Sequence, residues 1–334
     1  MAVGATILDA EGLVLTAAEK AFFRDADPFG FILFARNIES APQLRALCQE
    51  LRDAVGRNCL ITIDQEGGRV QRLRSPLARN WMAPLDHVIQ AGPGAERALY
   101  LRYRLIAAEL HALGVDSNCA PVADLLTAQT HPFLKNRCYG DSVEQVARLA
   151  RAVANAHLDG GVLPVLKHIP GHGRATADSH KDLPRVAAPL AELQAQDFAV
   201  FQALRDLPLG MTAHLVYQAL DSQPATISDT VMGMIRRDIG FDGLIMTDDI
   251  SMKALAGAPA ENAAAARAAG CDLVLYCNAP LDARRAVAEA AGEMDAKGQA
   301  RAAAALAQRL PPKPLDTEAV EAELTALMSG KVYV

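Results

Sequence analysis

Eight short apolar segments recur along the chain, and helical patterns lie between most of them. The segments are predicted strands at residues 5–8, 30–34, 59–64, 116–121, 163–168, 210–214, 244–248 and 272–277. Most are continuously apolar, which is typical of parallel strands buried on both faces. The helical patterns lie at residues 41–55, 95–113, 143–159, 190–204, 229–239, 260–269 and 282–291.

This alternation predicts an α/β fold, and eight strands alternating with helices suit a single (β/α)8 TIM barrel. A doubly wound open sheet is the alternative, but no G-x-G-x-x-G follows the first predicted strand. The length of 334 residues fits one barrel of about 250 residues with additions. We therefore predict one domain over residues 1–334, in which residues 295–334 form C-terminal helices packed on the barrel.

The composition limits the possible partners and locations. The net charge is -6, whereas a nucleic-acid binder usually carries a basic surplus. No apolar run approaches the roughly 18 residues of a membrane span, and the N-terminus lacks the basic start of a secretory signal. The 6 cysteines form no Cys-x-x-Cys pair, so we expect reduced thiols in a cytoplasmic protein. We expect a monomer that acts on a small molecule, with no nucleic-acid or membrane partner.

Charged residues stand where several of the predicted strands end. They are Asp64 after ITI, Lys167 and His168 in VLPVLKH, His214 in MTAH, and Asp248 and Asp249 in LIMTDD. The carboxyl ends of barrel strands meet on one face, and that face holds the active site of TIM-barrel enzymes. Burying such charges is costly unless they are paired. Their shared register therefore predicts an active site.

Asp248 and Asp249 are adjacent, so their side chains diverge along an extended strand end. A carboxylate at this position can be a base, a metal ligand or a covalent nucleophile. We assign the nucleophile to Asp248. Asp249 is then expected to cap the segment that follows it, because aspartate is a good N-cap residue.

The stretch KHIPGHGRATADSH contains His168, His172, Asp178 and His180. One interpretation is a metal site, since histidine and aspartate clusters bind zinc. The other is an acid/base pair in which Asp178 orients His180, because residues two apart in an extended loop face the same way. The histidine spacing matches no strong zinc pattern, and the small residues predict a mobile loop. We favour the acid/base pair.

The stretch DQEGGRVQR follows the third predicted strand. A carboxylate at Asp64 with Arg72 close by can hold vicinal sugar hydroxyls through bidentate hydrogen bonds. Glu66 is a second carboxylate in the same stretch, and the pattern alone leaves open whether it is a catalytic acid. Arg137, in NRCYGD, is placed in a loop after the fourth strand.

Together these motifs resemble the bacterial β-N-acetylglucosaminidases of glycoside hydrolase family 3, of the NagZ type. The resemblance covers the whole chain and is carried by IDQEGGRVQR, NRCYGD, KHIPGHGRATADSHKDLP and MIRRDIGFDGLIMTDDIS. It implies that Asp248 is the nucleophile, that His180 is the acid/base and that Asp178 is its partner. It also implies that the bound N-acetylglucosamine is held by Asp64, Arg72, Arg137, Lys167 and His168. Asn136, Cys138 and Tyr139 depart from the family pattern around the arginine.

The implied substrate is N-acetylglucosamine linked β-1,4 to 1,6-anhydro-N-acetylmuramic acid, with or without a peptide. The implied setting is cytoplasmic recycling of cell-wall peptidoglycan in a Gram-negative bacterium, where the product pool also influences β-lactamase induction. The chain ends too soon after Asp248 for the second domain of family 3 β-glucosidases, which favours the histidine acid/base. We expect no cofactor and no metal.

Three alternatives remain at the level of sequence. The first is another family 3 activity, either a β-glucosidase or a phosphorylase that uses phosphate as the nucleophile. The second is a metal-dependent hydrolase that uses His168, His172 and His180. The third is a sugar-binding barrel without catalysis.

Overall fold

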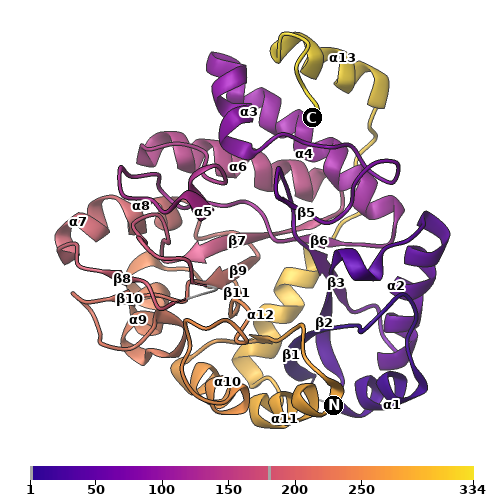
Figure 1. Cartoon of the computed structure of the whole chain (residues 1–334), viewed down its shortest axis with the longest axis vertical. Helices are drawn as coiled ribbons and strands as arrows, with labels where there is room; N and C mark the ends of the chain where they lie inside the picture. The colour runs from indigo at the N-terminus through magenta and orange to yellow at the C-terminus, as the bar shows by residue number, and fades with distance from the viewer. Residues whose placement is uncertain (1–2, 180–181) are drawn as a thin grey trace.

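The computed structural model describes residues 3–179 and 182–334, and a ring of parallel strands forms its centre (Figure 1). The 8-stranded sheet has the order β11-β9-β7-β6-β3-β2-β1-β12, and Met246 and Leu273 form a parallel bridge that joins its two ends. Its strands are β1 Gly4–Asp9, β2 Pro28–Leu33, β3 Leu60–Ile63, β6 Ser117–Asn118, β7 Leu163–Ile169, β9 Leu209–Thr212, β11 Leu244–Met246 and β12 Val274–Leu275. The predicted (β/α)8 barrel is thus confirmed.

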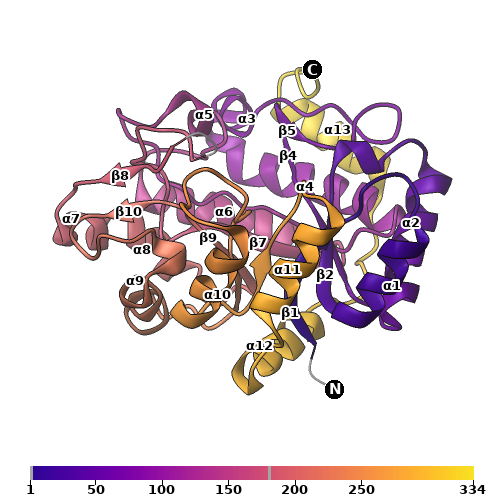
Figure 2. The same cartoon turned by 60° about the horizontal axis from the view of Figure 1, so that its bottom comes forward.

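Helices surround the strands on the outside (Figures 1 and 2). The α-helices are α1 Ala17–Ala26, α2 Ala41–Val55, α3 Pro84–Ala91, α4 Ala95–Ala112, α5 Pro132–Lys135, α6 Val143–Asp159, α7 Leu190–Ala195, α8 Asp197–Ala203, α9 Asp229–Met234, α10 Pro259–Ala269, α11 Leu281–Ala291, α12 Ala296–Ala307 and α13 Thr317–Leu327. Single turns of 3-10 helix lie at η1 Ala35–Asn37, η2 Gly92–Gly94 and η3 Ala225–Ile227, and a π-helix lies at η4 Ile235–Ile239. Two small pairings lie outside the barrel, between β4 Gln65–Gly67 and β5 Val70–Gln71 and between β8 Arg185–Val186 and β10 Val216–Tyr217.

The main differences from the predicted elements have local causes. The predicted helix 190–204 is two helices, because Gln196 leaves the helical region at φ -122° and ψ -83°. The predicted helix 229–239 widens into the π-helix η4 in its second half. Helix α1 was not predicted from the sequence, although it begins after a capping box formed by Thr16 and Glu19. Helix α3 was not predicted either.

Two layers of apolar side chains hold the barrel together. One cluster fills the inside of the barrel and includes Ala5, Val165 and Leu244. The other lies between the strands and the surrounding helices and includes Leu8, Leu47 and Val153. Neighbouring residues on a strand point to opposite faces, so a strand buried on both faces has to be apolar at every position. This explains the unbroken apolar runs in the sequence.

The C-terminal helices pack on the barrel at two separate places. Ala302 and Ala305 of α12 join the cluster inside the barrel, and α12 covers the end of the barrel where the strands begin (Figure 2). Leu324 of α13 and Met328 are buried in the outer cluster, and α13 lies beside α3 and α4 (Figure 1). The prediction that residues 295–334 are helices on the barrel agrees with these contacts.

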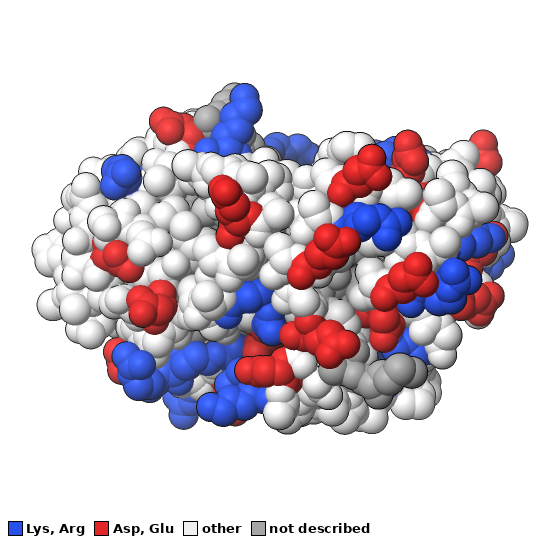
Figure 3. Space-filling model, turned by 90° about the horizontal axis from the view of Figure 1, so that it is seen from below, with Lys and Arg blue, Asp and Glu red and all other residues white. Residues whose placement is uncertain are grey.

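Acidic and basic side chains are interspersed on the face seen in Figure 3. Among the described residues, no helix combines the length and apolar character needed to cross a bilayer.

Candidate active site

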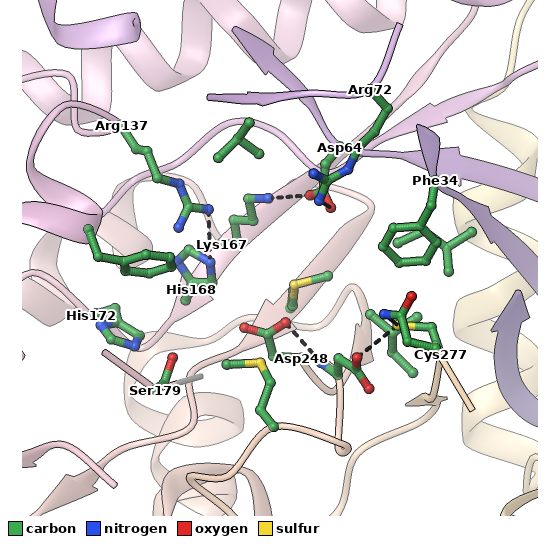
Figure 4. Close-up of a pocket in the computed structure, with 18 of the residues that line it drawn as sticks. Phe34, Asp64, Arg72, Arg137, Lys167, His168, His172, Ser179, Asp248 and Cys277 are labelled. Carbon is green, nitrogen blue, oxygen red and sulfur yellow. Dashed lines mark hydrogen bonds and ion pairs between the residues drawn. The ribbon is translucent and has the colours of Figure 1, made fainter. Parts of the chain in front are cut away.

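A cavity of about 400 Å³ opens at the carboxyl ends of the barrel strands (Figure 4). This volume lies within the usual range for a small-molecule site. Most of the residues predicted from the sequence line this one cavity, namely Asp64, Arg72, Arg137, Lys167, His168 and Asp248. The barrel therefore brings together side chains from all four of the motifs that carry the family resemblance.

Lys167, on β7, is the centre of an ion-pair network along one wall. Its Nζ donates to Asp64 Oδ1 at 2.9 Å and lies 2.8 Å from Glu66 Oε1. Arg72 Nη2 donates to the other oxygen of Asp64 at 3.0 Å. Burial disfavours the ionised form of Asp64, but the charges of Lys167 and Arg72 outweigh it and hold the pKa of Asp64 below 3.8. Asp64 is therefore ionised at neutral pH and presents a carboxylate to the cavity.

Glu66 is fully buried behind the cavity wall. Arg137 donates to it twice, from Nε to Oε2 at 2.9 Å and from Nη2 to Oε1 at 2.8 Å. Burial opposes ionisation, but Arg137 and Lys167 lower the pKa of Glu66 from 4.5 to about 2. A carboxylate that is ionised and paired with two cations has no proton to donate. We therefore interpret Glu66 as the support of Arg137 and Lys167, not as a catalytic acid.

His168, next to Lys167 on β7, is held by Asp124. The imidazole Nδ1 lies 2.6 Å from Asp124 Oδ2, and the backbone N–H groups of His168 and His172 donate to Asp124 Oδ1 at 3.3 and 2.7 Å. Nδ1 therefore carries the proton, and Nε2 faces Arg137 Nη2 at 3.5 Å. A metal ion at Nε2 would meet the positive charge of Arg137. This arrangement speaks against the metal-site interpretation of His168.

Asp248 lies just after β11 and faces Asp64 and Lys167 across the cavity (Figure 4). Its Oδ1 accepts a hydrogen bond from the backbone N–H of Asp249 at 2.8 Å. Burial disfavours the charged form, but His168 and this backbone donor help to hold the pKa of Asp248 below 3.8. Asp248 is therefore an ionised carboxylate that points into the site.

Asp249 does not cap a helix, which corrects the expectation from the sequence. Its carboxylate accepts from the backbone N–H and the hydroxyl of Ser251, at 3.0 and 2.8 Å, and closes a turn. The next helix, α10, begins only at Pro259. Cys277 also donates to Asp249 Oδ2 at 2.9 Å, and His214 Nε2 lies 3.1 Å from the backbone oxygen of Asp249. His214 thus supports the chain beside Asp248 and does not line the cavity.

The loop after β7 reaches the cavity through His172 and Ser179. His172 is 3% exposed, and burial, followed by the charge of His168, lowers its pKa from 6.5 to about 4. Asp178 is half-buried directly before Ser179, and its charge acts on the pKa of Arg69 at the cavity rim. His180 lies outside the described residues.

Sequence reasoning missed several residues of the site. Asp124 follows the segment predicted as the fourth strand. Its position near a strand end could have identified it as a candidate site residue, as it did for Asp64 and Asp248. Phe34 and Asn278 line the cavity after β2 and near β12. No motif pointed to them, because an aromatic residue or an asparagine after a strand is common in any loop.

The family model described as "Glycosyl hydrolase family 3 N terminal domain" matches residues 14–307. A β-hexosaminidase of Pseudomonas aeruginosa is 38% identical over 289 residues, covering 85% of this chain and 86% of that protein. A β-hexosaminidase of Chromobacterium violaceum is 39% identical over 294 residues, covering 84% of this chain and 80% of the other.

Solved structures are similar over almost the whole chain. Native NagZ from Neisseria gonorrhoeae is 32% identical, with a TM-score of 0.84, and the match covers 99% of this chain and 97% of that one. The same protein has been solved in complex with N-trifluoroacetyl-D-glucosamine. A glycoside hydrolase family 3 β-N-acetylglucosaminidase from a Paenibacillus species is 28% identical, with a TM-score of 0.86, over 97% of this chain and 67% of that chain.

Proposed function

The chain belongs to glycosyl hydrolase family 3, and from this premise we propose that it is a retaining exo-β-N-acetylglucosaminidase. That it is a glycoside hydrolase acting on N-acetylhexosamines follows from its β-hexosaminidase relatives. One observation carries the finer proposal. An ionised carboxylate, Asp248, faces a wall of charged side chains across a cavity of the size that takes a small molecule.

Asp248 is the nucleophile in this proposal. A retaining glycosidase attacks the anomeric carbon with a carboxylate and forms a covalent glycosyl-enzyme. The attacking oxygen must be unprotonated, and the lowered pKa of Asp248 keeps it so at neutral pH. The backbone N–H of Asp249 orients the carboxylate through Oδ1.

We assign the role of acid/base to His180, with Asp178 as its partner. His180 would give its proton to the departing glycosidic oxygen as the first bond breaks. The neutral imidazole would then take a proton from the water that attacks C1, and Asp248 would be released as a carboxylate. An ordinary histidine pKa near 6.5 suits both steps at neutral pH. This assignment rests on the motif that contains both residues.

The sugar is bound by Asp64, Arg72, Arg137, Lys167 and His168. Asp64 can accept hydrogen bonds from two neighbouring hydroxyls, while the cationic groups donate to sugar oxygens. The neighbouring ion pairs already hold these side chains in place, so little rotamer entropy is lost on binding.

The substrate class that we propose is N-acetylglucosamine linked β-1,4 to 1,6-anhydro-N-acetylmuramic acid, with or without its peptide. The setting would be cytoplasmic recycling of peptidoglycan, with an indirect influence on β-lactamase induction. Support for this comes from the similarity to NagZ over almost the full length of both chains.

The first test is release of nitrophenol from its β-N-acetylglucosaminide and from the matching β-glucoside, in EDTA and without phosphate. We expect turnover of the first substrate alone. Preference for the glucoside would replace the proposed substrate. Activity that requires phosphate would indicate a phosphorylase, and activity that requires a metal would restore the metal-dependent alternative.

The second test concerns the covalent intermediate. A 5-fluoro analogue of N-acetylglucosaminyl fluoride should label the protein, because it slows the hydrolysis of the glycosyl-enzyme. Peptide mapping by mass spectrometry should place the sugar on Asp248. A label on any other residue, or no label in an active enzyme, would contradict the proposed nucleophile.

A further inference from the structure

Three neighbouring strands of the barrel, β2, β1 and β12, end around Asn278. Asp9 is the last residue of β1, Arg36 lies in η1 after β2, and Asn278 follows β12. This group lies on other strand ends than Lys167, His168 and Asp248 and was not found from the sequence. Asn278 and its neighbour Cys277 line the cavity.

The backbone of Asn278 is held by a fully buried carboxylate. Asp9 is 0% exposed, and its Oδ2 accepts the backbone N–H of Asn278 at 2.7 Å. Arg36 pairs with the same oxygen, and Arg284 Nε lies 2.9 Å from the other. Asn278 has φ +60°, a left-handed conformation that is unfavourable for most residues other than glycine. The buried carboxylate of Asp9 thus fixes the backbone of Asn278 in this conformation, which asparagine adopts more readily than most other residues.

The amide of Asn278 is held as well, and in one orientation. Arg36 Nη1 donates to its Oδ1 at 2.7 Å. Its nitrogen, which carries two N–H donors, lies 3.5 Å from Cys277 Sγ, a weak acceptor. The other N–H has no hydrogen-bond partner within residues 3–179 and 182–334. Since Asn278 is an exposed residue, this donor is available at the rim of the cavity.

The depth of the cavity indicates which part of a substrate meets Asn278. Lys167 and His168 are 2% and 4% exposed, whereas Asn278 is exposed. An exo-acting enzyme binds the terminal sugar in the deep part of its pocket, and the leaving sugar extends toward the rim. We propose that Asn278 determines leaving-group specificity by donating a hydrogen bond from Nδ2 to an oxygen of the leaving sugar. Asp9 and Arg36 are its positioning residues. This inference rests on the proposed exo-β-N-acetylglucosaminidase function.

The test compares two substrates that share the terminal sugar. One is the disaccharide N-acetylglucosaminyl-β-1,4-anhydro-N-acetylmuramic acid, and the other is phenyl β-N-acetylglucosaminide, whose leaving group has no sugar oxygens. Asn278→Asp keeps the oxygen that binds Arg36 and removes the donor, and Asn278→Gly removes the side chain without backbone strain. For both variants, kcat/KM on the disaccharide should fall about fivefold to tenfold, as expected for one neutral hydrogen bond, and stay unchanged on the phenyl glycoside.

The positioning role is tested at Arg36. Arg36→Gln should give the same selective loss, and Arg36→Lys should restore part of it. Combined with Asn278→Gly, Arg36→Gln should cause little further loss of kcat/KM on the disaccharide, because the two changes remove the same interaction. Asn58→Ala, which alters an asparagine far along the chain from this group, is the matched control and should change neither substrate.

Equal losses on both substrates would overturn the inference, since they would indicate a contact with the terminal sugar or a general structural effect. An unchanged disaccharide rate in both Asn278 variants would also overturn it. A wild-type enzyme that hydrolyses neither substrate would overturn the proposed function itself, and this inference with it.

Discussion

Two carboxylates that are two residues apart in the chain have different surroundings in this protein. Asp64 lines the cavity, whereas Glu66 is fully buried and holds Arg137 and Lys167 from behind. In an uninterrupted strand both would share a face. They do not, because β3 ends at Ile63 and the chain turns into the β4–β5 pairing at Gln65. The residue types alone therefore could not separate the binding group from its support.

Replacing Glu66 should cost stability as well as substrate affinity. Glu66→Gln leaves two buried cations with less compensating charge, and breaking a buried pair of this kind costs about 3 kcal/mol or more. We expect this loss in urea unfolding, together with a raised KM. Glu323→Gln is the control, because Glu323 pairs with Arg97 at the exposed surface and such pairs contribute about 0.5 kcal/mol. Similar losses in the two variants would contradict the supporting role of Glu66.

The same carboxylate predicts how stability changes with pH. The pKa of Glu66 is lowered from 4.5 to about 2 in the folded protein, so its stabilising effect is complete above pH 4.5. That contribution is lost as the pH falls from 4.5 toward about 2. The free energy of unfolding, measured over this range, should therefore fall less steeply in Glu66→Gln than in the wild type. Parallel curves for the two proteins would mean that other groups cause the loss of stability at acidic pH.

Asp248 and Asp249 offer a matched pair of substitutions. Asp248→Ala should lower kcat on the nitrophenyl N-acetylglucosaminide by about 10⁴-fold, as expected for loss of a nucleophile. Asp249→Asn should retain far more activity, because Asp249 closes a turn with Ser251. Thermal unfolding of both variants separates catalysis from folding. Comparable activity of the two variants would contradict the assignment.

At the scale of elements, the β4–β5 pairing shapes the binding wall. Gly67 ends β4 with φ +108°, and a Cβ there would lie 1.9 Å from Arg102 Nη2. The guanidinium of Arg102 is fully buried, and its Nη2 donates to the backbone oxygen of Glu66 at 2.5 Å and to that of Met82 at 3.0 Å. The outer helix α4 thereby holds the main chain that carries Glu66.

Gly67→Ala should therefore weaken the site through this pairing. The strained backbone alone costs about 2 kcal/mol, and the displaced Arg102 adds to it. We expect a lower urea midpoint and a higher KM. Gly12→Ala is the control, since a Cβ at Gly12 meets nothing within 4 Å. If Gly67→Ala behaved like Gly12→Ala, the close approach of Arg102 would have no energetic consequence.

At the scale of the whole molecule, the prediction of one domain can be tested at the C-terminal helices. Leu324, Met328 and Val332 are buried in the same cluster as the barrel helices. Removing residues 316–334 exposes their partners and should cost about 5 kcal/mol. Calorimetry should therefore show a lower unfolding temperature for the truncated chain than for the full chain. Equal unfolding temperatures of the two chains would contradict the packing of this segment on the barrel.

The sequence by itself determined the barrel and most of the charged residues that line the cavity. Strands buried on both faces must be continuously apolar, so the charges at their ends stand out, as at Asp64, Lys167 and Asp248. The motifs around these charges also indicated the family.

Only the tertiary structure decided which groups pair. It showed that Glu66 faces Arg137, that Asp124 holds His168, and that Asp9 and Arg36 hold Asn278. These contacts join residues far apart in the chain and depend on strand register and chain turns. A local pattern reports the burial of a residue, whereas its partner is set by the closure of the barrel.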